Sequence, residues 1–142
     1  MGKSLPETIA GESVAISLED QIDVSRGDML VSADDLPVIS QDINLMLCWF
    51  NEIPLKTGGR YLLRLNSNEA GCILKGVDYR MNMNSLENDY ENRSVNMNDI
   101  AHVTIRTSKP VFFDSYKKNN ITGSMILIDE SSNETVAAGM IV

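Results

Sequence analysis

With 142 residues, 43% of them hydrophobic, the chain is long enough for one domain with a core and too apolar to be disordered by default. Its formal net charge of -8 repels phosphate backbones and argues against nucleic acid as a partner of the whole domain. There is no signal peptide and no apolar run near the ~20 residues of a membrane span, so the sequence predicts a cytoplasmic protein without membrane contacts.

The first part of the chain is predicted to contain two strands around a polar turn. Residues 13–18 alternate apolar and polar side chains, as a half-buried strand does, and residues 28–31 resume an apolar run. Arg26-Gly27-Asp28 is read as a turn, because glycine accepts a positive φ. Gly2-Lys3-Ser4 resembles the end of a phosphate-binding loop without the preceding strand and glycine, so a plain loop is favoured. Residues 34–37 are the candidate domain boundary.

The middle of the chain is predicted to form three strands. Residues 43–50 are a dense apolar run, typical of a strand that is buried on both sides or that closes a barrel. Residues 61–65 alternate again, and residues 72–83 form a long strand in which Gly76 suggests a bulge. Residues 84–97, rich in Asn, Glu and Asp, are predicted to be a surface loop.

The last part of the chain adds short strands and a hairpin. Residues 102–106 alternate, Ser108-Lys109-Pro110 is predicted to break that strand, and residues 111–113 follow as a short one. Two closing strands within residues 125–142 are predicted to pair around a loop at 129–134. About eight or nine short strands without a strong helix predict an all-β, antiparallel sandwich or barrel.

The candidate catalytic groups are each better explained as structural. His102 lies on the polar side of its strand, which favours a surface or interface histidine over a general base. One histidine and two cysteines give no zinc-ligand set. Acid–base catalysis needs two carboxyls that converge in a pocket. The acidic pairs lie instead at predicted strand ends: Glu19-Asp20, Asp34-Asp35 and Asp129-Glu130. The sequence therefore predicts no catalytic, cofactor-binding or metal-binding residue.

The thiols and aromatic rings are also predicted to serve packing. Cys48 and Cys72 are predicted to be buried free thiols, with a disulfide possible only if their strands are neighbours. A stacking platform for single-stranded nucleic acid needs a basic groove, so core packing is favoured for most aromatic residues: Trp49, Phe50, Tyr61, Tyr79, Phe112, Phe113 and Tyr116. The pair Tyr79-Arg80 is predicted to stay exposed, with the composition of an interface hot spot.

Motifs spread along nearly the whole chain carry a family resemblance. The narrowest is Leu18-Glu19-Asp20-Gln21-Ile22-Asp23-Val24-Ser25-Arg26-Gly27-Asp28. Others are Ala10-Gly11-Glu12-Ser13-Val14, Trp49, Pro54-Leu55, Gly76-Val77-Asp78-Tyr79-Arg80, Asn82-Met83-Asn84, Phe113-Asp114-Ser115-Tyr116, residues 122–129 and residues 135–140. Together they resemble the large, GTP-binding subunit of sulfate adenylyltransferase (ATP sulfurylase). Only the last of them is shared with elongation factor Tu, as a feature of the translational-GTPase superfamily.

The resemblance implies a C-terminal fragment of such a subunit. Residues 1–33 would be the last strands of an incomplete domain II-like barrel, and residues 35–142 a Greek-key-type antiparallel barrel like domain III of elongation factor Tu. The family makes adenylyl sulfate and pyrophosphate from ATP and sulfate, driven by GTP hydrolysis. GTP and Mg would be bound by a domain outside this chain. The chain itself would hold no cofactor. The implied role is a structural module, inactive alone, that contacts the catalytic small subunit of the heterodimer.

Two other functions and one association stay open at this stage. A translation-factor barrel that binds tRNA would share the fold, although the acidic charge opposes it. A free-standing enzyme would need a site that forms only in space. Strands cut from their own barrel leave unpaired edges, so residues 1–33 are expected to pack on the rest of the chain or to self-associate with another copy. A fused adenylyl-sulfate kinase domain in the parent is also left open.

Overall fold

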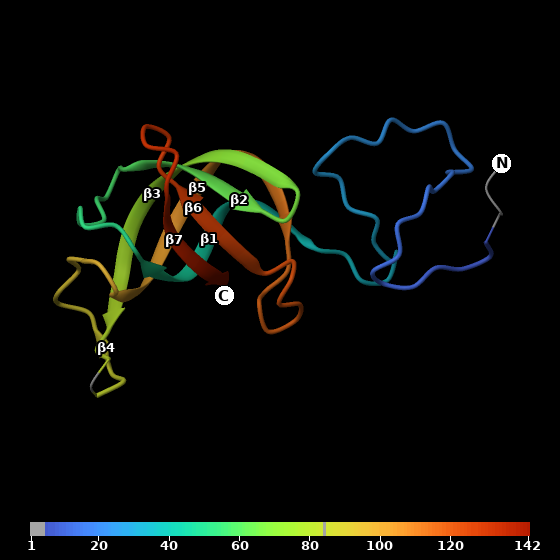
Figure 1. Cartoon of the computed structure of the whole chain (residues 1–142). Coiled ribbons are helices and arrows are strands. Elements are labelled where there is room, and N and C mark those ends of the chain that lie inside the picture. The colour runs from blue at the N-terminus through green and yellow to red at the C-terminus, as the bar shows by residue number, and fades with distance from the viewer. Residues whose placement is uncertain (1–4, 84) are drawn as a thin grey trace.

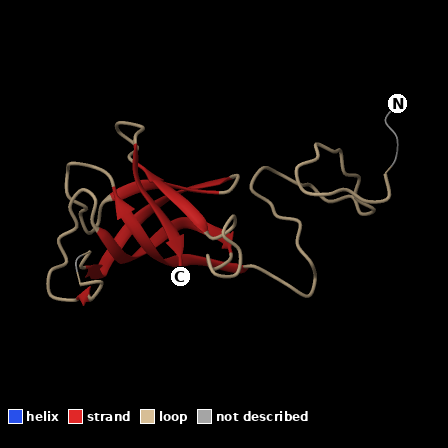
Figure 2. Cartoon of the chain, turned by 60° about the horizontal axis from the view of Figure 1, so that its bottom comes forward, coloured by secondary structure: helices blue, strands red, loops and turns tan. Residues whose placement is uncertain are grey.

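The computed structural model describes residues 5–83 and 85–142, and the regular structure in these residues is entirely β-strand. The strands are β1 (Val38–Trp49), β2 (Arg60–Leu65), β3 (Asn68–Met81), β4 (Asn88–Asp89), β5 (Ile100–Phe113), β6 (Ser124–Ile128) and β7 (Thr135–Ile141). They pair antiparallel in the order β2-β6-β7-β1-β5-β3-β4, and β2 also pairs with β3. All strands except the short β4 therefore close into a barrel (Figure 1, Figure 2).

The barrel core is made by alternate residues of each strand, because successive side chains of a strand point to opposite faces. The four inward residues of β1, from Ile43 to Trp49, are at most 2% exposed. Trp49 meets the ring of Tyr61 edge-on, with centroids 5.7 Å apart, and its Nε1 donates a hydrogen bond to the carbonyl of Ile53 at 2.9 Å. The predicted all-β antiparallel barrel of Greek-key type is thus confirmed.

Bulges explain both a correct and a wrong prediction about the long strands. The pairing of β3 with β5 shifts register at Gly76, as predicted. The predicted break at Ser108-Lys109-Pro110 is wrong, since β5 runs through it. The register of β1 against β5 shifts between Ser40 and Asp42, opposite residues 107–110. A bulge tolerates proline because the ladder needs no N–H at that point.

Two further expectations are corrected by the barrel. Of the two alternatives for the strand predicted at 43–50, the one that closes a barrel is correct, since β1 pairs with both β5 and β7. Burial on both sides is wrong: Asn44 is exposed, and Met46 and Cys48 are half-buried. The reason is that the barrel is one closed sheet, whose outer face points to solvent in this chain. The described residues also contain seven strands in place of the eight or nine expected, because residues 102–113 lie in a single strand and no strand forms before β1.

The segment from residue 5 to residue 37 lies beside the barrel without regular structure (Figure 1). The strands predicted at 13–18 and 28–31 are not formed, because no neighbouring strand lies alongside to complete a hydrogen-bonded ladder. The backbone makes local turns instead, such as the bond from the N–H of Asp28 to the carbonyl of Ser25 at 3.1 Å. Gly2-Lys3-Ser4 lies outside the described residues.

This segment contacts the barrel through polar groups while its apolar side chains stay exposed. The Nζ of Lys118 lies 2.5 Å from a carboxylate oxygen of Asp35, and Gly27 lies against the side chain of Asn68. The expected packing of the segment on the barrel is not found for its large apolar residues: Leu5, Ile9, Val14, Ile16, Leu18, Ile22, Val24, Leu30 and Val31. Its membership of a second barrel and its pairing with another copy stay predictions. Residues 5–83 and 85–142 include no helix that could span a membrane.

The two cysteines are free thiols in different environments. Cys48 lies on β1 and Cys72 on β3, two strands that do not pair with each other. Cys72 is buried, and this burial, assisted by the nearby Glu130 carboxylate, raises the pKa of its thiol to about 12. Cys48 is only half-buried. The prediction of free thiols is confirmed, with burial complete for one of them.

Labelling with a thiol reagent at about pH 8 should therefore occur in two phases. Because the thiolate is the reactive form, a pKa of about 12 leaves Cys72 about a thousandfold less ionised than an ordinary thiol. Cys48 should react first, and the slow phase should accelerate about tenfold for each unit of pH. The variant Cys48→Ser should lose the fast phase. A fast phase that survives in this variant would contradict the assignment.

Candidate interaction surface

The acidic pairs lie in turns, as predicted. Asp129 accepts hydrogen bonds from the N–H groups of Ser131 and Ser132 at 2.8 and 3.1 Å. The side-chain hydrogen bond from Ser131, followed by these backbone bonds, holds the pKa of Asp129 below its usual range. Glu19 and Asp20 are exposed in the N-terminal segment. In the described ranges 5–83 and 85–142, no three His, Cys, Asp or Glu side chains could together hold a metal ion.

His102 lies in a polar row on the outer face of β3 and β5. Its Nδ1 is 2.8 Å from Oδ2 of Asp78, and its ring stacks on Tyr79 with centroids 5.0 Å apart and planes 10° from parallel. The hydroxyl of Thr104 lies 3.0 Å from Oδ1 of Asn44 and 3.4 Å from Oδ2 of Asp78. The histidine is thus oriented by a carboxylate and an aromatic ring. His102 lies on the outer face of the barrel, but only 17% of its side chain is exposed, so the histidine predicted at the surface is half-buried.

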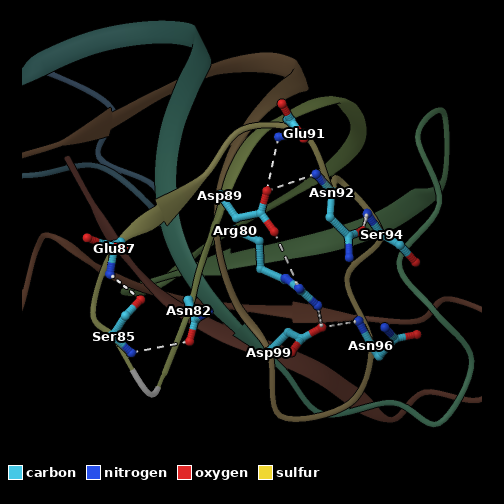
Figure 3. A network of polar contacts seen from close by, with 10 residues as sticks. All are labelled: Arg80, Asn82, Ser85, Glu87, Asp89, Glu91, Asn92, Ser94, Asn96 and Asp99. Atoms are coloured by element: carbon cyan, nitrogen blue, oxygen red, sulfur yellow. Dashed lines mark hydrogen bonds and ion pairs between the residues drawn. The ribbon is translucent and has the colours of Figure 1, made fainter.

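Arg80, which follows Tyr79 on β3, is held by two carboxylates from the segment that joins β3 to β5 (Figure 3). Its Nη1 lies 3.2 Å from Oδ2 of Asp99, and its Nη2 lies 3.6 Å from Oδ2 of Asp89. Both carboxylates also accept backbone N–H groups: Asp99 from Asn96 at 2.8 Å, and Asp89 from Asn92 at 3.0 Å. The latter bond is the main cause that lowers the pKa of Asp89. Arg80 therefore fixes the loop to the barrel.

The prediction that Tyr79 and Arg80 stay exposed is corrected, because both are half-buried. Tyr79 packs between the rings of His102 and Tyr90, the latter with its centroid 5.3 Å away. Asp89 and Asp99 were not predicted as the partners of Arg80. The signal was available: an arginine at the end of a strand preceded a loop rich in acidic residues.

The described residues between β3 and β5, 82–83 and 85–99, are here called the 82–99 loop and combine one buried anchor with an exposed apolar surface. Val95 is fully buried, and its carbonyl accepts a hydrogen bond from the N–H of Leu55 at 3.0 Å. Large apolar side chains around this anchor point to solvent: Met83, Leu86, Tyr90 and Met97. Exposed apolar groups on an ordered loop are typical of an interface.

A second apolar surface lies on the outer face of β1, β6 and β7. It is a hollow of about 500 Å³ whose lining includes Met46, Cys48, Ile126, Ala138 and Met140. The small residues Ala138 and Gly139 of β7 are part of this lining. The lining also includes the polar side chains of Arg64, Tyr116 and Ser124, but most of its residues are apolar. The hollow therefore suits an apolar side chain from a partner better than a small polar substrate.

Comparison with known proteins identifies the family and the fold of the barrel. Residues 42–142 match the family model described as GTP-eEF1A C-terminal domain-like. A solved structure of Sup35 complexed with GDP superposes with a TM-score of 0.70 at 12% identity, covering 78% of this chain and 27% of that chain. A second, Sup35 complexed with GMPPNP, superposes with a TM-score of 0.68 at 14% identity and the same coverage. These structures show the fold.

Curated relatives match almost the whole chain. Sulfate adenylyltransferase subunit 1 of Bacteroides thetaiotaomicron is 37% identical over 92% of this chain and 29% of its own length. The protein of the same name from Shewanella oneidensis is 39% identical over 97% of this chain and 29% of its own length. The chain spans less than a third of the length of these relatives, which confirm the resemblance inferred from the motifs. With the match over residues 42–142, the chain belongs to the GTP-eEF1A C-terminal domain-like family.

Proposed function

We propose that the chain is the C-terminal β-barrel part of the GTP-binding subunit of a sulfate adenylyltransferase. The observation that carries this proposal is an identity of 37% to subunit 1 of that enzyme across 92% of the chain, including the segment before the barrel. The parent complex would make adenylyl sulfate and pyrophosphate from ATP and sulfate, driven by GTP hydrolysis.

Within that complex, we assign the barrel a structural and subunit-binding role. GTP and Mg would be held by a part of the parent outside this chain, and adenylyl transfer would take place on the companion small subunit. This division agrees with the contacts of the polar side chains named above: His102 is bound to Asp78, and Asp129 caps a turn through the N–H of Ser131. The two free thiols agree with a reducing compartment such as the cytoplasm.

We also propose that residues 1–33 belong to a preceding barrel in the parent. In residues 13–31 the large apolar side chains alternate in part with polar ones, yet all of them except the half-buried Met29 are exposed here. Such a segment gains from a neighbouring strand, which would pair its backbone and cover its apolar side. A second copy of the chain would satisfy the same groups, so self-association of the isolated chain is an expected consequence.

Titration calorimetry with the companion small subunit from the same genome tests the proposed function. The chain should bind that subunit. It should not bind GTP, because the proposed GTP site lies outside this chain. The control titrates unacylated tRNA, which the acidic barrel should bind weakly if at all. Salt-dependent binding of tRNA without binding of the small subunit would favour a translation-factor barrel and overturn the proposal.

A further inference from the structure

We propose that the companion subunit docks on the 82–99 loop. The matching surface of that subunit would be an apolar pocket surrounded by basic residues. The inference rests on the proposed function and assigns to one loop the subunit contact that the proposal requires. The docking side chains are Met83, Leu86, Tyr90 and Met97, which are 55%, 71%, 59% and 47% exposed.

Leu86 is the most informative of these residues. Its backbone has a φ of 58°, a left-handed conformation that is unfavourable for a leucine, and its N–H donates a hydrogen bond to the carbonyl of Asn82 at 2.7 Å. The strained turn points a large apolar side chain into water, where it adds nothing to the barrel core. A glycine would fit this turn better, so the leucine is explained by a contact outside the chain.

The loop is held in shape before any partner arrives. Arg80 binds Asp89 and Asp99 at the base of the loop (Figure 3), and the Tyr90 ring packs against Tyr79. Val95 anchors the middle of the loop in the core. A surface that is already ordered loses little conformational entropy on binding, which favours affinity. Exposed methionine and tyrosine side chains on such a surface have the composition of a binding hot spot.

Charge on the loop indicates the chemistry of the partner. Asp89 and Asp99 share the single positive charge of Arg80, so one negative charge remains among these three groups, and Glu87 and Glu91 stay exposed beside Leu86 and Tyr90. The chain as a whole carries a formal charge of -8. A partner with lysine or arginine around an apolar hollow would therefore be attracted at long range and would match the loop at contact.

The loop is preferred over the hollow on the outer face of β1, β6 and β7. The loop carries side chains that project from the barrel, whereas the hollow only receives them. The strain at Leu86 and the exposed carboxylates have no counterpart among the residues named for the hollow. Met140, which lines the hollow and is 40% exposed, therefore serves as a test of the rival surface.

Calorimetric titration of the full chain with the companion subunit separates the two surfaces. The double variant Leu86→Ala with Tyr90→Ala should weaken binding by at least about tenfold, whereas Met140→Ala and Ile121→Ala should leave it unchanged. Ile121 is a matched control, since it is 74% exposed in the loop at the other end of β5. A loss of affinity in Met140→Ala with none in the double variant would overturn the inference in favour of the hollow.

Two further variants test strain and charge. Leu86→Gly should keep or raise the thermal midpoint, because glycine suits the positive φ, while binding falls; a structural role for Leu86 would lower the midpoint instead. Glu87→Lys with Glu91→Lys should slow association and remove its dependence on NaCl between about 50 and about 300 mM.

The outcomes distinguish this inference from the proposed function. If the unaltered chain does not bind the companion subunit, the proposed function fails and the inference fails with it. If the unaltered chain binds and the Leu86 and Tyr90 variants bind equally well, only the docking surface is wrong.

Discussion

Replacing Trp49 with alanine is expected to lower the free energy of unfolding by about 3–5 kcal/mol, as large-to-small substitutions in packed cores do. Trp49 is 2% exposed and lies at the end of β1, where its ring packs edge-on against Tyr61. The change would leave a cavity between these strands and also remove the hydrogen bond from Nε1 to the carbonyl of Ile53. Urea denaturation followed by circular dichroism measures the shift in midpoint.

The next residue on the chain gives a matched control. Phe50 is 44% exposed, so Phe50→Ala should change the free energy of unfolding by less than about 1 kcal/mol. Trp49→Phe should fall between the two variants, because it keeps an aromatic ring in the core and loses the indole hydrogen bond. Equal midpoints for Trp49→Ala and Phe50→Ala would show that the core is not organised around Trp49.

Gly123→Ala is the second substitution with a large expected effect, about 1–3 kcal/mol from overpacking. A Cβ at this position would lie 2.5 Å from both Cα and N of Tyr116 and 2.8 Å from the carbonyl oxygen of Asn119. All three are backbone atoms, which cannot move aside as a flexible side chain can. The carbonyl of Gly123 also accepts the N–H of Ile141 at 2.8 Å, so a displaced loop would loosen the end of β7.

Hydrogen exchange and denaturation together test this prediction. The amides of Tyr116 and Ile141 should exchange faster in Gly123→Ala, since the carbonyl of Ile141 accepts the first and that of Gly123 the second. Gly76→Ala is the matched control, because a Cβ there meets no atom within 4 Å. A fully stable Gly123→Ala, or an equal loss in Gly76→Ala, would contradict the steric explanation.

The fold could be predicted from the sequence where apolar periodicity and turn residues agreed. Residues 61–65 alternate cleanly and form β2, and the loop at 129–134 closes the β6–β7 hairpin, where Asp129 N–H donates to the carbonyl of Glu134 at 2.9 Å. Pro110 misled the prediction, because the register shift that accommodates it depends on β1, far away in the chain. The strand predicted at residues 13–18 is absent for another reason: these residues have a strand pattern, but no neighbouring strand lies beside them to pair with.

The candidate surface could be predicted only in part. The sequence indicated a surface loop at 84–97 and singled out Tyr79 and Arg80, which the structure places beneath that loop. It could not show that Asp99 returns to Arg80, because the ion pair spans the whole loop. The positive φ of Leu86 was equally hidden, since glycine and asparagine, and not leucine, are the usual signals for that conformation.

Because the closing strand β7 lies beside β1, the first and last strands of the barrel are neighbours. Ile141 pairs with Leu45, and the N–H of Val142 donates to the carbonyl of Asn44 at 3.1 Å. The start of β1 at Val38 is therefore only seven residues along β1 from the partner of Ile141, the last residue of β7, which is roughly 23 Å along an extended strand. A short flexible linker could join the two ends, and the barrel could be reopened at the exposed turn 129–134. The barrel is thus suited to circular permutation, with its core and strand pairing kept while its point of attachment moves.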